Sequence, residues 1–175
     1  DKFSVIIQRR ITLCNNMSFF HFSRQIDNTV IGQIKGLRLE SIGMACQMLM
    51  FYFGNYALHA QCLTRIIKSD DILLTTRDYQ SWDEKHEENH DEIYNLKKYS
   101  SVIKGGKVTS VNITPCLDLT ITLDNDITIQ VIIENGYFHF GEENEQYRFF
   151  ECSEDENEDE NMPPHYVVYN KRIEI

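Results

Sequence analysis

The segment of this chain most suggestive of chemistry is His86-Glu87-Glu88-Asn89-His90, in which two histidines stand four residues apart. On an α-helix, side chains at positions i and i+4 share one face, so the two histidines would be able to bind Zn²⁺. Glu87 would then activate a zinc-bound water molecule. The chemistry predicted by this pattern is metal-dependent hydrolysis.

The surroundings of this segment argue against a zinc centre. Charged residues flank it, among them Lys85 and Asp91, which indicates a solvent-exposed helix rather than one packed in a core. No G-x-x-H continuation follows His90 to supply a third histidine. We therefore interpret the segment as part of a polar surface helix and predict no metal site and no cofactor. A zinc-dependent hydrolase remains an alternative function.

Other catalytic signatures are also missing from the sequence. There is no G-x-S-x-G nucleophile motif and no Walker glycine loop. The Gly-Gly-Lys triplet at residues 105–107 has neither the preceding glycine nor the following Ser or Thr of a phosphate-binding loop. We expect that the protein is not an enzyme, and a ligand-binding or structural β-domain is a further alternative.

Cysteine usage and hydropathy indicate a compartment. The five cysteines are odd in number and none form a C-x-x-C pair, which favours reduced thiols in a cytoplasmic protein. No apolar run approaches the ~20 residues that a membrane span needs. Arg9 and Arg10 interrupt the apolar residues that follow Phe3, so we expect no signal peptide and no membrane contact.

The formal net charge is −10, and two short segments carry the whole anionic excess. Residues 151–161 contain seven acidic residues and no basic one, and residues 83–92 contain six acidic residues with Lys85. Binding to nucleic acid needs a basic surface that neutralises phosphates, so direct binding to nucleic acid is not expected. The two acidic segments would instead attract a basic protein surface.

Residues 103–133 contain the clearest β pattern. Apolar residues occupy every second position within residues 117–123, which is the period of a half-buried strand. The Asp-Asn-Asp sequence at residues 124–126 favours a turn, and the alternation resumes over residues 127–133. The sequence therefore predicts a β-hairpin.

Residues 34–62 repeat the same order of features. The Ile-Lys-Gly triplet at residues 34–36 recurs at residues 103–105, and a Gly-Asn turn at residues 54–55 takes the place of the second hairpin's turn. Residues 48–53 are apolar on both faces, which predicts a central strand. We interpret the two segments as an internal duplication.

A helix is expected between the two repeats, from about residue 88 to residue 99. Ser81-Trp82-Asp83-Glu84 has the S-x-x-E form of a capping box, and Lys97 and Lys98 near the end suit the helix dipole. Trp82 would either anchor this helix in the core or contact a partner. A second helix is predicted near residues 19–26.

The expected fold class is α+β and mostly β: two related antiparallel β-hairpin units, packed as a sheet or sandwich, with a connecting helix. Further strands are predicted at residues 72–76, 137–140 and 166–169. The predicted divisions are an N-terminal extension (1–30), a first β repeat (31–80), the connecting helix (81–100), a second β repeat (101–150), an acidic loop (151–164) and a C-terminal strand (165–175).

The duplicated pattern G-x-x-V-x-x-V…L-x-L-x-(turn)-x-I-x-V resembles that of the small β-rich immunity proteins encoded beside bacterial polymorphic and contact-dependent growth inhibition toxins. The resemblance covers residues 34–76 and 103–140 and consists of apolar and turn positions. It implies a non-enzymatic protein that binds a cognate toxin domain in the cytoplasm and covers its active site.

Many toxins of these systems are nucleases with basic grooves, so the resemblance implies that the acidic residues contact the toxin. The predicted contact residues in the first acidic segment are Asp83, Glu84, Glu87, Glu88 and Asp91. Those in the second acidic segment are Glu154, Asp155, Glu156, Glu158 and Asp159. Aromatic anchors such as Trp82, Tyr79 or Tyr147 would add buried contact area.

Overall fold

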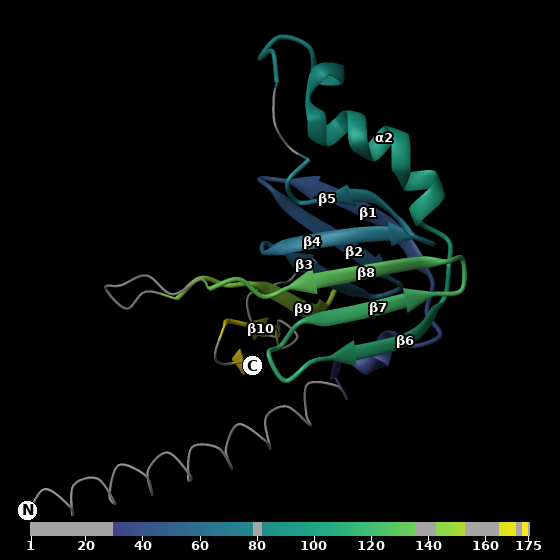
Figure 1. The fold of residues 1–175 in the computed structure, drawn as a ribbon, viewed down its shortest axis with the longest axis vertical. Helices are drawn as coiled ribbons and strands as arrows, with labels where there is room; N and C mark the ends of the chain where they lie inside the picture. The colour runs from purple at the N-terminus through teal and green to yellow at the C-terminus, as the bar shows by residue number, and fades with distance from the viewer. Residues whose placement is uncertain (1–29, 79–81, 136–142, 153–164, 171–172, 175) are drawn as a thin grey trace, which may run out of the picture.

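The computed structural model describes residues 30–78, 82–135, 143–152, 165–170 and 173–174. Within these residues the protein consists of two antiparallel sheets, of six and five strands, and one α-helix (Figure 1). The predicted class of a mostly β, α+β protein with antiparallel strands is therefore confirmed. The described helices include none with the length and apolar character needed to cross a membrane.

The six-stranded sheet contains the first hairpin and the C-terminal strands. Its spatial order is β1-β2-β3-β9-β10-β11. The strands are β1 (Leu39–Ala45), β2 (Met48–Phe53), β3 (Tyr56–Ala60), β9 (Tyr147–Glu151), β10 (Tyr166–Val168) and β11 (Ile173–Glu174). The pairing of β2 with β3 around the turn at residues 54–55 confirms the first predicted hairpin.

The five-stranded sheet contains the second hairpin, and its spatial order is β5-β4-β8-β7-β6. The strands are β4 (Leu63–Lys68), β5 (Asp71–Thr75), β6 (Val108–Ile113), β7 (Leu119–Leu123) and β8 (Ile127–Ile132). The pairing of β7 with β8 confirms the second predicted hairpin. The strands predicted at 72–76 and 166–169 correspond to β5 and β10, whereas residues 137–140 and 19–26 lie outside the described residues.

One hydrophobic core joins the two sheets. Successive side chains of a strand point to opposite faces, and those on the inner faces form this core. Leu119, Ile121 and Leu123 of β7 point inward and are buried, while the threonines between them are only half-buried. Phe51 and Phe53 of β2 meet this core from the other sheet and are fully buried. β2 lies between β1 and β3, as predicted for a central strand, but only one of its faces is fully buried.

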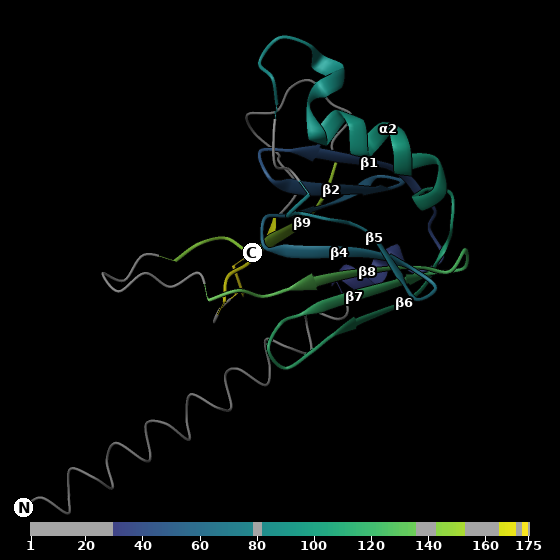
Figure 2. The same ribbon diagram turned by 45° about the horizontal axis from the view of Figure 1, so that its top comes forward.

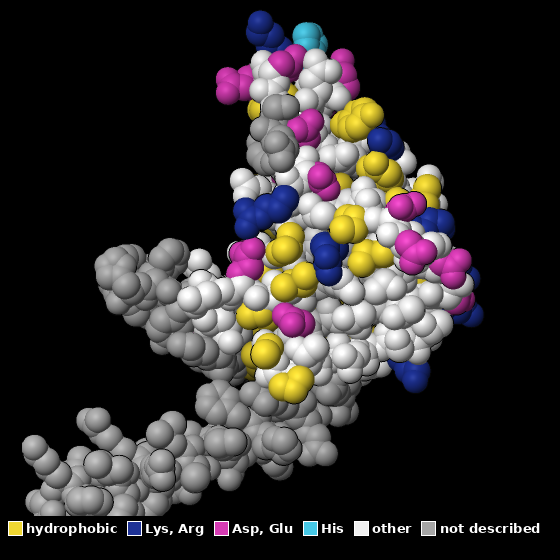
Figure 3. Space-filling view, viewed as in Figure 1, with side chains coloured by type: hydrophobic (Ala, Val, Ile, Leu, Met, Phe, Trp, Pro, Cys, Tyr) yellow, Lys and Arg dark blue, Asp and Glu magenta, His cyan; other side chains and the backbone are white. Residues whose placement is uncertain are grey.

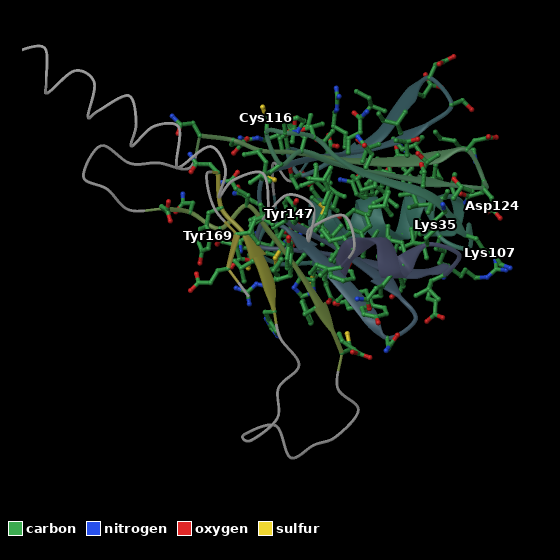
Figure 4. All side chains as sticks on the ribbon, turned by 90° about the horizontal axis from the view of Figure 1, so that it is seen from below. Lys35, Lys107, Cys116, Asp124, Tyr147 and Tyr169 are labelled. Carbon is green, nitrogen blue, oxygen red and sulfur yellow. The ribbon has the colours of Figure 1, made fainter. Side chains whose placement is uncertain are left out.

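Tyr147 of β9 ties the core to the loop before β7. Its side chain is fully buried at the centre of the molecule (Figure 4), and its hydroxyl donates a hydrogen bond of 3.1 Å to the carbonyl of Leu117. The expectation that Tyr147 anchors a partner is therefore wrong, and Tyr79 lies outside the described residues. Leu117 has a positive φ of 74°, which a non-glycine residue adopts only when its surroundings hold it there. The bond therefore fixes a loop that the backbone alone would not favour.

The helix α2 (Asp91–Ile103) contacts β1 of one sheet and β5 of the other (Figures 1 and 2). Leu96, Tyr99 and Ile103 pack on the core, because their spacing places them on one helix face. The helix begins three residues later than predicted and continues to Ile103. Its N-cap is His90, so the capping box predicted at residues 81–84 is wrong.

The starts of β1 and β6 lie side by side and connect the two sheets. The Gly36 N–H donates to the carbonyl of Val108 at 2.8 Å, and the Gly105 N–H donates to the carbonyl of Leu39 at 2.7 Å. Arg38 and Lys107 face each other in an antiparallel bridge between these bonds. The two Ile-Lys-Gly triplets therefore lead into strands that meet at one end of the molecule, where Figure 4 labels Lys107.

Candidate functional site

The segment that suggested a zinc site does not form a helix. His86 has extended backbone angles, Glu87–Asn89 form a short 3-10 helix (η2), and His90 is extended again before α2 begins. The premise that the two histidines share one α-helical face is therefore wrong, as is the interpretation of this segment as a polar surface helix. Among the described residues, no group of three His, Cys, Asp or Glu side chains is placed to bind a metal.

Asp83 organises this loop. Its Oδ1 accepts hydrogen bonds from the backbone N–H groups of Lys85 and His86 at 2.9 and 3.0 Å, and its Oδ2 accepts one from the Asn89 side chain at 2.8 Å. These bonds, with the His86 backbone N–H contributing most, hold the pKa of the Asp83 carboxyl well below its usual value. Asp83 was predicted to contact a partner, but its carboxylate is engaged within the loop.

His90 and Glu92 attach the end of the loop to the β-sheet. The His90 Nδ1 accepts a hydrogen bond of 3.2 Å from the Glu92 N–H, which caps the helix. The Glu92 carboxylate is buried and accepts a hydrogen bond of 3.3 Å from the backbone N–H of Gln47 in the β1–β2 turn. The end of the loop that leads into α2 is therefore attached to the β1–β2 turn.

Three predicted contact residues remain available on this loop. The side chains of Glu84, Glu87 and Glu88 are exposed, and in the described part of the chain they form no hydrogen bond or ion pair. Acidic side chains lie around this loop at the top of Figure 3. We call Glu84, Glu87 and Glu88 the free carboxylates.

The remaining predicted contact residues divide into two groups. Asp91 is the first residue of α2, is only partly exposed and has interactions of its own. The predicted contact residues of the second acidic segment lie outside the described residues; they are Glu154, Asp155, Glu156, Glu158 and Asp159.

A second polar group on the outer face of the six-stranded sheet was not predicted from the sequence. His59 of β3 packs edge-on against Phe150 of β9, with ring centroids 4.9 Å apart, and Phe150 stacks on His165 at 4.6 Å. Arg148, opposite His59 in the strand register, forms an ion pair with Glu145. The alternation of apolar and polar residues predicts each strand from its own sequence. These side chains come together only because strands that are distant in the sequence pair with each other.

The His59 side chain is held in an environment that opposes its protonation. Its Nε2 atom is buried, and no group among the described residues forms a hydrogen bond with it. Burial lowers the pKa of His59, and the nearby Arg148 charge lowers it further, while Glu145 acts in the opposite direction. The neutral imidazole is therefore the form that the fold favours.

Folding stability is consequently expected to fall on acidification. Because the pKa of His59 is lower in the folded protein than in the unfolded chain, the loss begins below the unfolded value of about 6.5 and grows as pH falls through the folded value. The His59→Gln variant should lose part of this dependence. Urea unfolding of both proteins at pH 8, 6 and 5 would measure it, and identical pH profiles for the two would contradict the assignment.

Comparisons with models of protein families, with curated proteins and with solved structures found no match to this chain.

Proposed function

We propose that this protein is an immunity-type inhibitor, a non-enzymatic cytoplasmic protein that binds a cognate toxin domain and neutralises it. The toxin domain is expected to be a nuclease with a basic active-site surface, which the inhibitor covers. The observation that carries this proposal is the exposed acidic loop before α2, where the free carboxylates stand on a backbone fixed by Asp83.

The rigidity of the loop favours a binding role. A carboxylate on a preorganised backbone loses less conformational entropy on association than one on a flexible tail. Carboxylates that are unpaired in the free protein also need not break an ion pair before they meet a cationic partner. Such a surface favours rapid and specific association with a basic protein.

The experiment that tests the proposal is a growth assay. Cells producing the toxin domain encoded immediately upstream should survive when they also produce this protein. Cells producing an equal amount of the Glu84→Lys/Glu87→Lys/Glu88→Lys variant should survive poorly. Equal killing with and without the wild-type protein would contradict the proposed function.

We also propose that the β1–β3 and β6–β8 segments derive from one duplicated unit. Gly36 and Gly105 occupy matching positions in the Ile-Lys-Gly triplets, and both have a positive φ, of 86° and 99°. The register of β1 shifts between Leu39 and Ser41, and that of β6 shifts between Val108 and Ser110. In the pairing of the triplets, Ser41 corresponds to Ser110. Matching glycines and matching register shifts are what a duplicated unit would retain.

The two glycines therefore support a paired prediction. Gly36→Ala and Gly105→Ala should each lower the free energy of unfolding by about 1–2 kcal/mol, because a side chain disfavours this backbone conformation. Apart from the adjoining residues, no described atom lies within 4 Å of the added Cβ at either position, so sterics should not distinguish them.

Gly32→Ala is the control, since Gly32 lacks a positive φ and its added Cβ also meets nothing within 4 Å. Chemical denaturation of the three variants should give two similar losses and little change for Gly32→Ala. A loss of unfolding free energy in only one of the variants Gly36→Ala and Gly105→Ala would contradict the structural equivalence of the two glycines.

A further inference from the structure

Two aromatic rings stand in the solvent beside the N-terminus of α2. Trp82 is 45% exposed and Tyr94 is 54% exposed. The Trp82 ring lies 5.2 Å from the His90 ring, whereas the centroid of the Tyr94 ring lies 5.7 Å from the Lys98 ammonium. We call Trp82 and Tyr94 the aromatic pair.

The rings of Trp82 and Tyr94 are not among the side chains that pack α2 on the core. The residues through which α2 packs on the core are Leu96, Tyr99 and Ile103. The expectation that Trp82 anchors the helix in the core is therefore wrong. Large exposed aromatic side chains are characteristic of residues that are buried by a binding partner.

The Trp82 ring is oriented before any partner arrives. The Trp82 Nε1–H donates a hydrogen bond of 3.0 Å to the His86 carbonyl, which fixes the indole on the loop that Asp83 organises. Because its only polar hydrogen is already used, the indole offers a partner its ring face and apolar edge. An aromatic ring face attracts cations, and tryptophan does so most strongly.

The charge beside the aromatic pair indicates which cation fits. Glu84, Glu87 and Glu88 are on the same loop as Trp82 and are unpaired within the described residues. Arginine suits a ring face beside carboxylates better than lysine, because its planar guanidinium stacks on aromatic rings and binds carboxylates through two parallel hydrogen bonds.

We propose that Trp82 is a docking site for an arginine side chain on the protein partner. The guanidinium stacks on the Trp82 ring, and one of the free carboxylates neutralises its charge. This assignment rests on the proposed function for its partner, but the local recognition can be tested without the toxin.

Trp82 is the only tryptophan in the chain, so its fluorescence reports directly on this site. The full-length protein is titrated with a hexa-arginine peptide and, separately, with a hexalysine peptide of the same charge. Hexa-arginine should change the Trp82 emission at a concentration roughly 3- to 10-fold lower than hexalysine requires. An unchanged emission, or equal responses to the two peptides, would overturn the arginine assignment.

One variant and one control locate the response. Glu84→Gln/Glu87→Gln/Glu88→Gln should weaken the hexa-arginine response several-fold, whereas Ile72→Ala should not change it. Ile72 is also exposed, at 54%, but lies on β5. Undiminished binding by the triple glutamine variant would overturn the proposal. A positive response without a toxin complex would count against the proposed function alone.

Discussion

Reversing the free carboxylates, as Glu84→Lys/Glu87→Lys/Glu88→Lys, is expected to weaken binding to the toxin domain roughly 100-fold, mainly by slowing association. The reversal replaces three attractive contacts with three repulsive ones on a loop whose backbone is hydrogen-bonded to Asp83. Because these groups are exposed, added salt should reduce the affinity of the wild-type protein and narrow its difference from the variant. Association kinetics at two salt concentrations would measure both effects.

A matched control separates local contact from total charge. Glu40→Lys/Asp70→Lys/Asp71→Lys changes the net charge by the same amount, using exposed acids of β1, the β4–β5 turn and the start of β5. This variant should associate at a rate close to that of the wild-type protein. If both triple variants lose affinity equally, the acidic loop is not the contact surface.

Replacing Tyr147 with alanine should lower the free energy of unfolding by about 3–5 kcal/mol, the usual cost of removing a buried aromatic side chain. The ring is fully buried, and its loss would leave a cavity in the core. The change would also remove the hydrogen bond to the Leu117 carbonyl. Urea unfolding with an unchanged slope would measure the loss as a shift of the midpoint.

Tyr147→Phe separates the hydrogen bond from the packing. It keeps the ring and leaves the Leu117 carbonyl without its donor, so it should cost about 1–2 kcal/mol. A Tyr147→Ala variant nearly as stable as the wild-type protein would show that this residue does not hold the core to the loop before β7.

The two hairpins were predictable because the residues that specify the strands and the turn of each hairpin are adjacent in the sequence. A period of two over residues 117–123 and 127–133 specifies strands with one buried face, and Asp-Asn-Asp between them specifies the turn. The same reasoning correctly placed the hairpin of β2 and β3. The duplication inferred from these patterns remains a proposal.

The start of the helix was not predictable from the charge pattern. Ser81-x-x-Glu84 has the form of a helix cap, but the Asp83 carboxylate binds the backbone N–H groups of Lys85 and His86 in a loop. Such local side-chain bonds compete with helix formation. The predicted contacts at Glu84, Glu87 and Glu88 stay predictions, with positions on the surface that suit them.

The group around His59 could not have been found from the sequence, because it depends on pairing between β3 and β9. Nothing near His59 in the chain indicates that Arg148 and Phe150 will lie beside it. For the same reason, the local sequence does not indicate that Tyr147 reaches the Leu117 carbonyl from the other sheet.

The most direct test of the proposed function is co-purification of this protein with the toxin domain encoded immediately upstream, followed by measurement of the mass of the complex in solution. We predict a 1:1 complex that survives size-exclusion chromatography in low salt and dissociates more readily in high salt. Separate elution of the two folded proteins at low salt would contradict the account.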